Sequence, residues 1–595
     1  MERNSDVTTA LTNRPKIPLL VFFRDARHVL KMDALGLEIL KIAFPAALAL
    51  AADPVASLID TAFIGRLGSV QLAAVGVSIA IFNQASRITI YPLVSITTSF
   101  VAEEDTLDRM SAAEANKGEQ LLKNSVGDAS VTELMPLGTE TIATNYLKQE
   151  KDREINKSES KKSLVMPTGS EQLDDLEKSS AEKEMNPENE ALESGAEHSN
   201  KKSGKRHITS ASTAMVFGTF LGLIQAILLI VAAKPLLSVM GVKSVSSVTE
   251  ICYAPCQYHI IMKPISLEGM KIASQSARND SPMLPYALKY LTIRSLGAPA
   301  VLLSLSLQGI FRGFKDTTTP LYATLAGDVM NIILDPILIF VCHLGVSGAA
   351  IAHVVSQYLM FFILLWMLMK QVDIVPPSFK TLQYGKFFSN GIFLMTRVIA
   401  VTFCVTLSAS LAARMGAVPM AAFQVCLQVW LMSSLLADGL AVAGQAILAC
   451  GFAAGDLDKV TSTACRVLQM SFVFGLGLTV VVGAGLFFGA PVFSKDPNVL
   501  HLIHIAVPFV AGTQTINSIS FVFDGVNYGA ADFKYSAYSM VIVAICSVAS
   551  LFYLSRTNGF IGLWIGLTIY MALRTFAGVW RMGTGTGPWR FLRRI

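Results

Sequence analysis

The sequence predicts an all-α polytopic membrane protein in which twelve transmembrane helices form two lobes of six, related by pseudo-two-fold symmetry. Three observations lead to this prediction. Hydrophobic residues make up 52% of the chain and charged residues only 15%, whereas a soluble protein carries about 25% charged residues. The hydrophobic residues occur in long blocks, and a helix that spans a bilayer needs about 20 of them. Short motifs from the first half also recur, in the same order, in the second half.

The chain begins with a polar segment, 1–33, in which no signal peptide is expected because no long apolar core precedes a small-residue cleavage site. The first part of the N-lobe, 34–102, should hold two spans, at about 36–62 and 71–101. Basic residues just before the first span place the N-terminus in the cytoplasm under the positive-inside rule; they are Arg24, Arg27, His28 and Lys31.

Residues 103–211 interrupt this pattern. They are dense in Glu, Lys, Ser and Asn and contain one aromatic residue, Tyr146. Such a segment cannot bury enough apolar surface to form a core, so a disordered loop is predicted. Its basic end, next to the following span, keeps the loop on the cytoplasmic side.

The rest of the N-lobe is expected at 212–370, a linker at 371–385, the C-lobe at 386–582 and a cytoplasmic tail at 583–595. An even number of spans places both termini on the same side of the membrane. This side is expected to be the cytoplasm, because most of the connecting segments that carry basic residues also lie there. The further spans are expected at about 212–240, 286–311, 318–343, 346–370, 386–412, 418–450, 464–489, 501–527, 533–555 and 559–581.

The internal repeat relates six spans to six spans. The matching phrases begin at Leu67 and Met415, at Gly309 and Phe521, and at Gly345 and Gly559. An even number of spans in each repeat indicates a parallel repeat about an axis along the membrane normal. Two such lobes around a central cleft form a transporter architecture.

Acidic residues occur inside the first and fifth spans. Asp53 and Asp60 lie in the first span, and Asp328, Asn331 and Asp335 lie in the fifth. The last two are four residues apart and share one helix face. An ionised carboxylate at the bilayer centre costs roughly 2.5–3.5 kcal/mol on insertion scales, so these groups are functional candidates. The alternative for Asp335, which precedes a proline, is that it only caps a helix end.

Two arginines also lie inside spans, Arg87 in the second and Arg397 in the seventh. Each either pairs with an acid nearby or holds an anionic substrate. For Arg397 the second role is favoured, with Asp524 as its anion at rest and substrate in transit. Gln424 and Gln428 are four residues apart on the eighth span. They are candidates for substrate contact, although hydrogen bonding between helices is the favoured reading.

Other classes of function are excluded or disfavoured. The net charge of +5 is small and lies mostly in loops, which argues for membrane orientation and against nucleic-acid binding. The eight cysteines are scattered without the spacing of metal ligands. No nucleophile–base pair or phosphate-binding loop stands out, so neither an enzyme nor a cofactor site is expected.

Three phrases resemble the multidrug and toxic compound extrusion (MATE) family: DTAFIGRLG at 60–68, NIILDP at 331–336 and GIFRGFKDTTTP at 309–320. The long loop, together with the phrases at 398–414, 421–431 and 583–589, resembles the plant citrate-efflux branch of that family. Against this branch, residues 244–279 look like an insertion on the outer side, because 241–243 and 280–284 fit one continuous phrase.

The resemblance implies efflux by alternating access, driven by inward movement of protons or sodium ions. Asp60, Asn331 and Asp335 match the acidic cluster of the family's first lobe, and Asp53 is added as a coupling candidate. The branch implies export of citrate, or a similar organic anion, across the plasma membrane of root cells, in iron movement or aluminium tolerance. The expected partners are the cargo and the lipid bilayer, and a monomer is expected.

The expected mechanism starts when a proton from outside binds the cluster of Asp60 and Asp335. Neutralising a carboxylate removes its desolvation cost and lets the first lobe repack. Citrate held by Arg87 and Arg397 is then released outward. Two alternatives remain: an exporter of organic cations, xenobiotics or secondary metabolites, and a non-transporting sensor that works through the loop at 103–211.

Overall fold

The computed structural model describes residues 33–127, 208–240, 282–372, 384–493 and 496–593, and these residues are almost entirely helical. The predicted insertion at 244–279 and most of the N-terminal segment and the inter-lobe linker lie outside the described residues. In the first lobe the helices are α1 (Ala34–Gly65), α2 (Ser69–Gly127), α4 (Thr209–Val231), α5 (Ala233–Val239), α8 (Leu284–Ser295), α9 (Ala298–Gly313), α10 (Thr318–Pro336), the π-helix η3 (Ile337–Val341) and α11 (Val346–Gln371).

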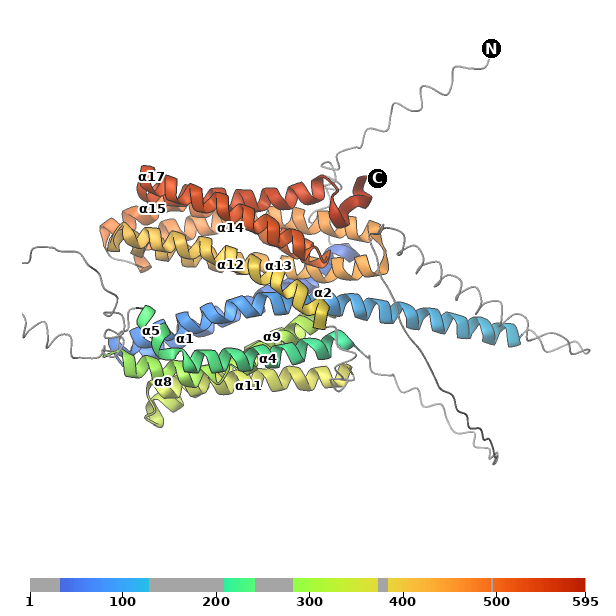
Figure 1. The fold of residues 1–595 in the computed structure, drawn as a ribbon, viewed down its shortest axis with the longest axis horizontal. Helices are drawn as coiled ribbons and strands as arrows, with labels where there is room; N and C mark the ends of the chain where they lie inside the picture. Colours follow the sequence, from blue (N-terminus) through green and yellow to red (C-terminus); the bar gives the residue numbers. More distant parts are fainter. Residues whose placement is uncertain (1–32, 128–207, 241–281, 373–383, 494–495, 594–595) are drawn as a thin grey trace, which may run out of the picture. The chain divides into compact units, whose positions relative to one another are not determined.

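The second lobe follows the same plan. Its helices are α12 (Tyr384–Arg414), α13 (Ala417–Ala454), α14 (Leu457–Phe493), α15 (Pro497–Gly512), α16 (Gln514–Gly529), α17 (Phe533–Gly583) and the short 3₁₀ helix η4 (Gly587–Arg593). Figure 1 shows α12, α14, α15 and α17 gathered in one group, and α4, α5, α8 and α11 in another. Each lobe buries its own apolar clusters between these helices.

The described residues contain nine helices long and apolar enough to cross a membrane, and eleven spans if each of two bent helix pairs counts as one. Helix α17 has 51 residues. At a rise of 1.5 Å per residue it is far longer than a hydrocarbon core of about 30 Å. Its backbone leaves the helical region at Gly559. Division at this glycine gives twelve spans, the number expected from the sequence.

Helix α2 corrects one boundary of the sequence analysis. Disorder was expected from residue 103, but the helix continues without a break to Gly127 (Figure 1). This part of the chain contains no proline and is rich in Ala, Glu, Lys and Leu, which are strong helix formers. An ion pair of 2.8 Å between Arg109 and Asp105, one turn apart, adds support. The remainder of the predicted loop, 128–207, lies outside the described residues.

Two glycines let helices cross closely at equivalent places in the repeat. A Cβ atom at Gly313 of α9 would lie 2.9 Å from the side chain of Val101 on α2. A Cβ atom at Gly525 of α16 would lie 2.8 Å from the Cα of Ala441 on α13. The residue before each glycine is charged, Arg312 in one lobe and Asp524 in the other. The close crossings therefore fix the positions of two opposite charges.

Candidate coupling and substrate sites

The N-lobe brings the predicted acidic residues of α1 and α10 together. Asn331 donates a hydrogen bond of 2.8 Å from Nδ2 to Oδ1 of Asp60. Asp335 is 1% exposed, and its carboxyl interacts with that of Asp60. Among the described residues, no donor hydrogen-bonds to either oxygen of Asp335. Asp335 therefore does not cap a helix end, and the chain continues past Pro336 into the π-turn of η3.

A second carboxyl pair lies two helical turns before the first. Asp53 and Asp328 each stand seven residues before their counterparts in the first pair, which puts them on the same faces of α1 and α10. The two carboxyls interact with each other. Asp53 was expected at the coupling site, and Asp328 was a functional candidate without an assigned role. We call Asp53, Asp60, Asp328, Asn331 and Asp335 the acidic group. It extends farther along the lobe than the family motif alone suggested.

Arg294 is a functional candidate that the sequence analysis missed. It lies on α8, is 8% exposed, and acts electrostatically on both Asp53 and Asp60. Its Nη1 donates to the hydroxyl of Tyr290 at 3.0 Å, and its guanidinium lies 4.9 Å from the ring centre of Phe82. The sequence signal that could have revealed Arg294 was its position inside the predicted span 286–311, near the start of that span. This cation offsets part of the negative charge of the acidic group.

In the C-lobe, one carboxylate joins two arginines. Asp524 of α16 forms ion pairs with Arg397 of α12 and Arg574 of α17. Arg397 also donates a hydrogen bond of 3.1 Å to the carbonyl of Ser536. Arg397 thus contacts Asp524, the carboxylate that the sequence analysis suggested as its partner in the absence of substrate. Arg574 was missed, although an arginine inside the predicted span 559–581 was a visible signal.

Charged residues of both lobes act electrostatically on Tyr91 of α2. The side chain is 46% exposed, yet it interacts electrostatically with Arg87 and Arg312 of the first lobe and with Asp438 and Arg574 of the second. Arg87 is exposed, as a group in contact with solvent or cargo must be. We call Tyr91, Arg87, Arg312, Arg397, Asp438, Asp524 and Arg574 the central charge group.

The two predicted glutamines do not join helices. Gln424 and Gln428 are both exposed on α13. Neither makes a hydrogen bond to another residue in the part of the chain that the structure describes. The favoured reading of hydrogen bonding between helices was therefore wrong. Both side chains are free to contact solvent, lipid or cargo.

The lobes meet at the end of the bundle where α1 begins. Gln445 of α13 donates hydrogen bonds to the carbonyl of Ser95 at 2.7 Å and to Oγ of Ser99 at 2.9 Å, both on α2. Glu38 of α1 forms ion pairs with Lys315 of its own lobe at 2.7 Å and with Lys459 of the other at 3.4 Å. This predicted cytoplasmic end is therefore closed by direct contacts between the lobes.

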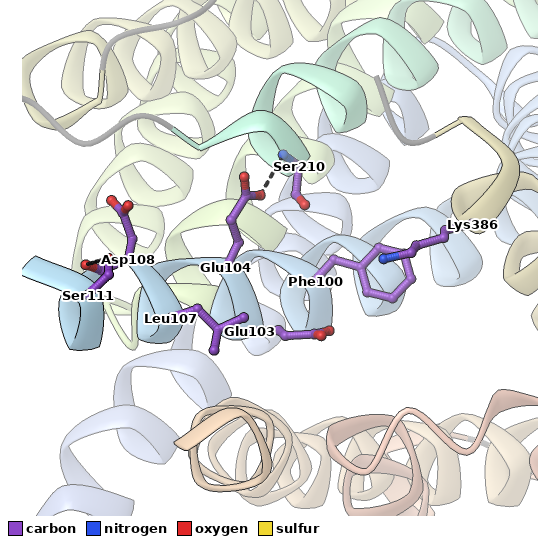
Figure 2. Close-up of a pocket in the computed structure, with 8 residues that line it drawn as sticks. All are labelled: Phe100, Glu103, Glu104, Leu107, Asp108, Ser111, Ser210 and Lys386. Atoms are coloured by element: carbon purple, nitrogen blue, oxygen red, sulfur yellow. Dashed lines mark hydrogen bonds between the residues drawn. The ribbon is translucent and has the colours of Figure 1, made fainter. Parts of the chain in front are cut away.

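A separate cavity of about 430 Å³ lies where α2 passes the start of α4 (Figure 2). Glu104 accepts hydrogen bonds there from the backbone N–H groups of Thr209 and Ser210, each at 2.7 Å, so it caps α4. The cavity shares no residue with the acidic group or the central charge group. Its lining consists of Phe100, Glu103, Glu104, Leu107, Asp108, Ser111, Ser210 and Lys386.

Among the described residues, no group of three or more His, Cys, Asp or Glu side chains could hold a metal ion. Helices α1 and α10 carry the two carboxyl pairs, and α2, α9, α12, α13, α16 and α17 carry the central charge group.

Comparisons with known proteins agree with this architecture. The sequence profile of the MatE family matches residues 269–337 and 394–554. The chain is 55% identical to Protein DETOXIFICATION 42 of Arabidopsis thaliana over 98% of both chains. It is 56% identical to Protein DETOXIFICATION 43 of the same plant, over 100% of this chain and 98% of the relative.

Solved structures show the same fold. A crystal structure of a MATE P26A mutant superposes with a TM-score of 0.64 at 16% identity, over 96% of this chain and 99% of that chain. An outward-facing multidrug resistance MATE transporter of the MOP superfamily superposes with a TM-score of 0.61 at 16% identity, over 93% and 97%. The expectation of a transporter rather than an enzyme is confirmed. The alternative of a sensor that works through the loop at 103–211 stays a prediction, because 128–207 lie outside the described residues. The chain belongs to the MATE family of secondary efflux transporters.

Proposed function

We propose that this transporter exports citrate, or a similar organic anion, in exchange for protons across the plasma membrane, with both termini in the cytoplasm. The observation that carries the proposal is the sign of the central charge group. Four arginines stand there against two aspartates, an excess of two positive charges. A positive site between low-dielectric walls attracts and concentrates anions. An organic cation would meet repulsion at the same place.

The acidic group of the N-lobe supplies the coupling. Asp60 and Asp335 face each other without a cation within ion-pairing distance among the described residues. Two carboxyls that share a site hold one proton between them, because two like charges at close range cannot both ionise freely. Entry of a proton from the outer side is therefore accommodated by the pair, and its release to the cytoplasm resets the site. Sodium is the alternative coupling ion that the family resemblance allows.

The direction of transport follows from the charge of the cargo. The inside-negative membrane potential favours expulsion of an anion by about 2.3 kcal/mol per charge per 100 mV. Opening of the contacts between Gln445 and α2 would give the cargo access from the cytoplasm. We further propose, from the resemblance to the citrate-efflux branch, that this export serves iron movement or aluminium tolerance.

The second candidate function is export of organic cations. It is favoured by the two carboxyl pairs of the N-lobe, which would attract a cationic compound if they were open to the cargo. Two relatives at lower identity, from Staphylococcus haemolyticus and Staphylococcus aureus, carry the printed name Multidrug export protein MepA, which names drugs as what those proteins export.

Efflux from oocytes separates these functions. Cells that express the transporter are injected with labelled citrate or with a labelled organic cation, and efflux is followed in an acidic or a neutral bath, with and without sodium. Citrate efflux that accelerates in the acidic bath, independently of sodium, is expected. Efflux of the cation alone would replace the proposal by the second candidate.

A further inference from the structure

Arg312 differs from the other buried arginines of the central charge group. It is 8% exposed and lies in the last turn of α9. Arg397 and Arg574 both form ion pairs with Asp524. The side chain of Arg312 forms no hydrogen bond or ion pair with any residue that the structure describes. A buried charge without a partner is unfavourable by several kcal/mol. The dipole of α9 stabilises a cation in the last turn by only about 0.3–1 kcal/mol, so it does not offset this cost.

The residues that interact electrostatically with Arg312 come from both lobes. Its electrostatic neighbours are Tyr91 on α2 and Asp438 on α13 of the opposite lobe. Neither lies within ion-pairing distance. Tyr91 is 46% exposed and Asp438 is partly exposed. The two side chains that interact electrostatically with the buried guanidinium are thus themselves accessible at the surface of the protein.

The internal repeat shows what is missing beside Arg312. Its equivalent in the second lobe is Asp524, since the Arg312-Gly313 step matches the Asp524-Gly525 step. Asp524 is neutralised by two arginines of its own lobe. Arg312 carries the opposite charge at the equivalent place, and none of the described carboxylates of its own lobe lies within ion-pairing distance of it. The protein thus supplies a complete ion-pair network on one side of the pseudo-axis and an uncompensated cation on the other.

We propose that Arg312 is the anchoring residue for a carboxylate of the transported anion. The planar guanidinium suits bidentate binding of a carboxylate. Exposed Arg87, one turn before Tyr91 on α2, and the hydroxyl of Tyr91 would contact other oxygens of the same cargo. Asp438 faces Arg312 from the opposite lobe as a competing internal anion, which favours release once the lobes rearrange. This inference rests on the proposed export of organic anions and names its binding residue.

Binding is measured on the purified full-length transporter by the rise in its thermal unfolding temperature with citrate. We expect Arg312→Gln to weaken citrate binding about 10- to 100-fold, the usual range for one charge-assisted interaction. Arg312→Lys should keep part of the affinity. Asp438→Asn should strengthen binding, because it removes the competing carboxylate. Arg414→Gln, an exposed arginine at the end of α12, is the matched control and should bind like the wild type.

The unfolding temperature without citrate separates an anchoring role from a structural one. Loss of an unpaired buried charge should leave it unchanged or raise it, whereas loss of a structural contact would lower it. In oocytes, Arg312→Gln should raise KM for citrate far more than it lowers the maximal rate. If the wild type exports citrate but Arg312→Gln has the same KM and the same citrate-induced rise in unfolding temperature, the anchoring role of Arg312 is overturned. The proposed export of citrate would then still stand.

Two further outcomes are decisive. Wild-type protein that neither binds nor exports citrate would overturn the proposed function together with this inference. Chloride or sulfate that raises the unfolding temperature as much as citrate, at equal concentration and ionic strength, would identify an inorganic anion site and overturn the anchoring of cargo. A shift that requires the carboxylates of citrate, and that Arg312→Gln abolishes, supports it.

Discussion

Gly345 and Gly559 adopt the same backbone conformation, with φ 55° and ψ −131° in the first and φ 56° and ψ −130° in the second. Each stands at the start of the last span of its lobe, at equivalent places in the repeat. Residues with a Cβ atom rarely adopt positive φ at this ψ. The two lobes thus share a backbone feature that only glycine supplies without strain.

Replacement of either glycine by alanine should destabilise the protein to a similar extent. No atom lies within 4 Å of a Cβ built at Gly345 or Gly559, so the cost is conformational strain, about 1–3 kcal/mol. Gly477 of α14 is the control, since its Cβ would also meet no atom and its backbone is helical. Gly345→Ala and Gly559→Ala should each lower the thermal unfolding temperature, and Gly477→Ala should not. Equal temperatures for all three would contradict the strain argument.

Asp335→Asn should abolish stimulation of efflux by an acidic bath while the protein remains folded. The amide cannot exchange a proton, and the site loses the second member of its carboxyl pair with Asp60. Citrate efflux against a pH step measures the effect, with surface expression as the check on folding. Asp458→Asn, an exposed acid in the first turn of α14, is the control. Normal pH-dependent efflux by Asp335→Asn would remove this residue from the coupling mechanism.

Asp33 gives a prediction about pH outside the membrane-spanning helices. It caps α1 by accepting a hydrogen bond of 2.8 Å from the backbone N–H of Gly36, and it pairs with Arg466 at 3.0 Å. The hydrogen bond from Gly36, aided by Arg466, lowers the pKa of Asp33 below its ordinary value of 3.8. A lowered pKa in the folded state means that the stabilisation is present above pH 3.8 and is lost as the pH falls through the folded value.

Asp33→Ala should therefore lower the unfolding temperature by a constant amount at neutral and mildly acidic pH. The difference from wild type should shrink below about pH 4, because the wild-type carboxylate is then protonated too. Thermal unfolding in detergent across this range provides the measurement. A difference that grows as the pH falls would show that the cap and the ion pair are not the source of the stabilisation.

The parts of the fold that were predictable from sequence are those set by hydrophobic block length and by short local phrases. The repeat, the helix pair that carries Asp60 and Asp335, and the long apolar spans follow from such signals. The continuation of α2 beyond residue 103 was not predictable in this way, because a charged helix and a disordered loop have similar compositions. The lack of apolar residues favoured a loop, whereas the helix propensity of Ala, Glu, Lys and Leu favoured the helix that forms.

The charge partners could be predicted only in part. Arg397 and Asp524 were both visible as charges inside spans, but Arg574 lies 50 residues after Asp524 in the sequence. Which of several intramembrane arginines meets a given carboxylate depends on helix crossings, and the crossings depend on close approaches such as that at Gly525. Sequence spacing carries no information on these long-range contacts.

Gln445 should hold the lobes together at the predicted cytoplasmic end. It is 6% exposed and donates across the lobe boundary to Ser95 and Ser99. Loss of these bonds in Gln445→Ala should favour opening at this end, at a cost of about 1–3 kcal/mol for the two partners left behind. Cys450 lies one helical turn farther along α13 and contacts the carbonyl of Ala102 at 3.8 Å. It reports on opening in a variant whose other cysteines are replaced.

Maleimide should label Cys450 several-fold faster in Gln445→Ala than in the parent. The matched control is Gln225, which is also 6% exposed but donates to Oγ of Ser86 at 2.6 Å within the first lobe. Because Gln225→Ala breaks a contact that does not join the lobes, it should lower the unfolding temperature without faster labelling. Equal labelling rates in the two variants would mean that the hydrogen bonds of Gln445 do not resist separation of the lobes, and that the ion pair of Glu38 with Lys459 and the apolar contacts of α1 with α13 keep this end closed without them.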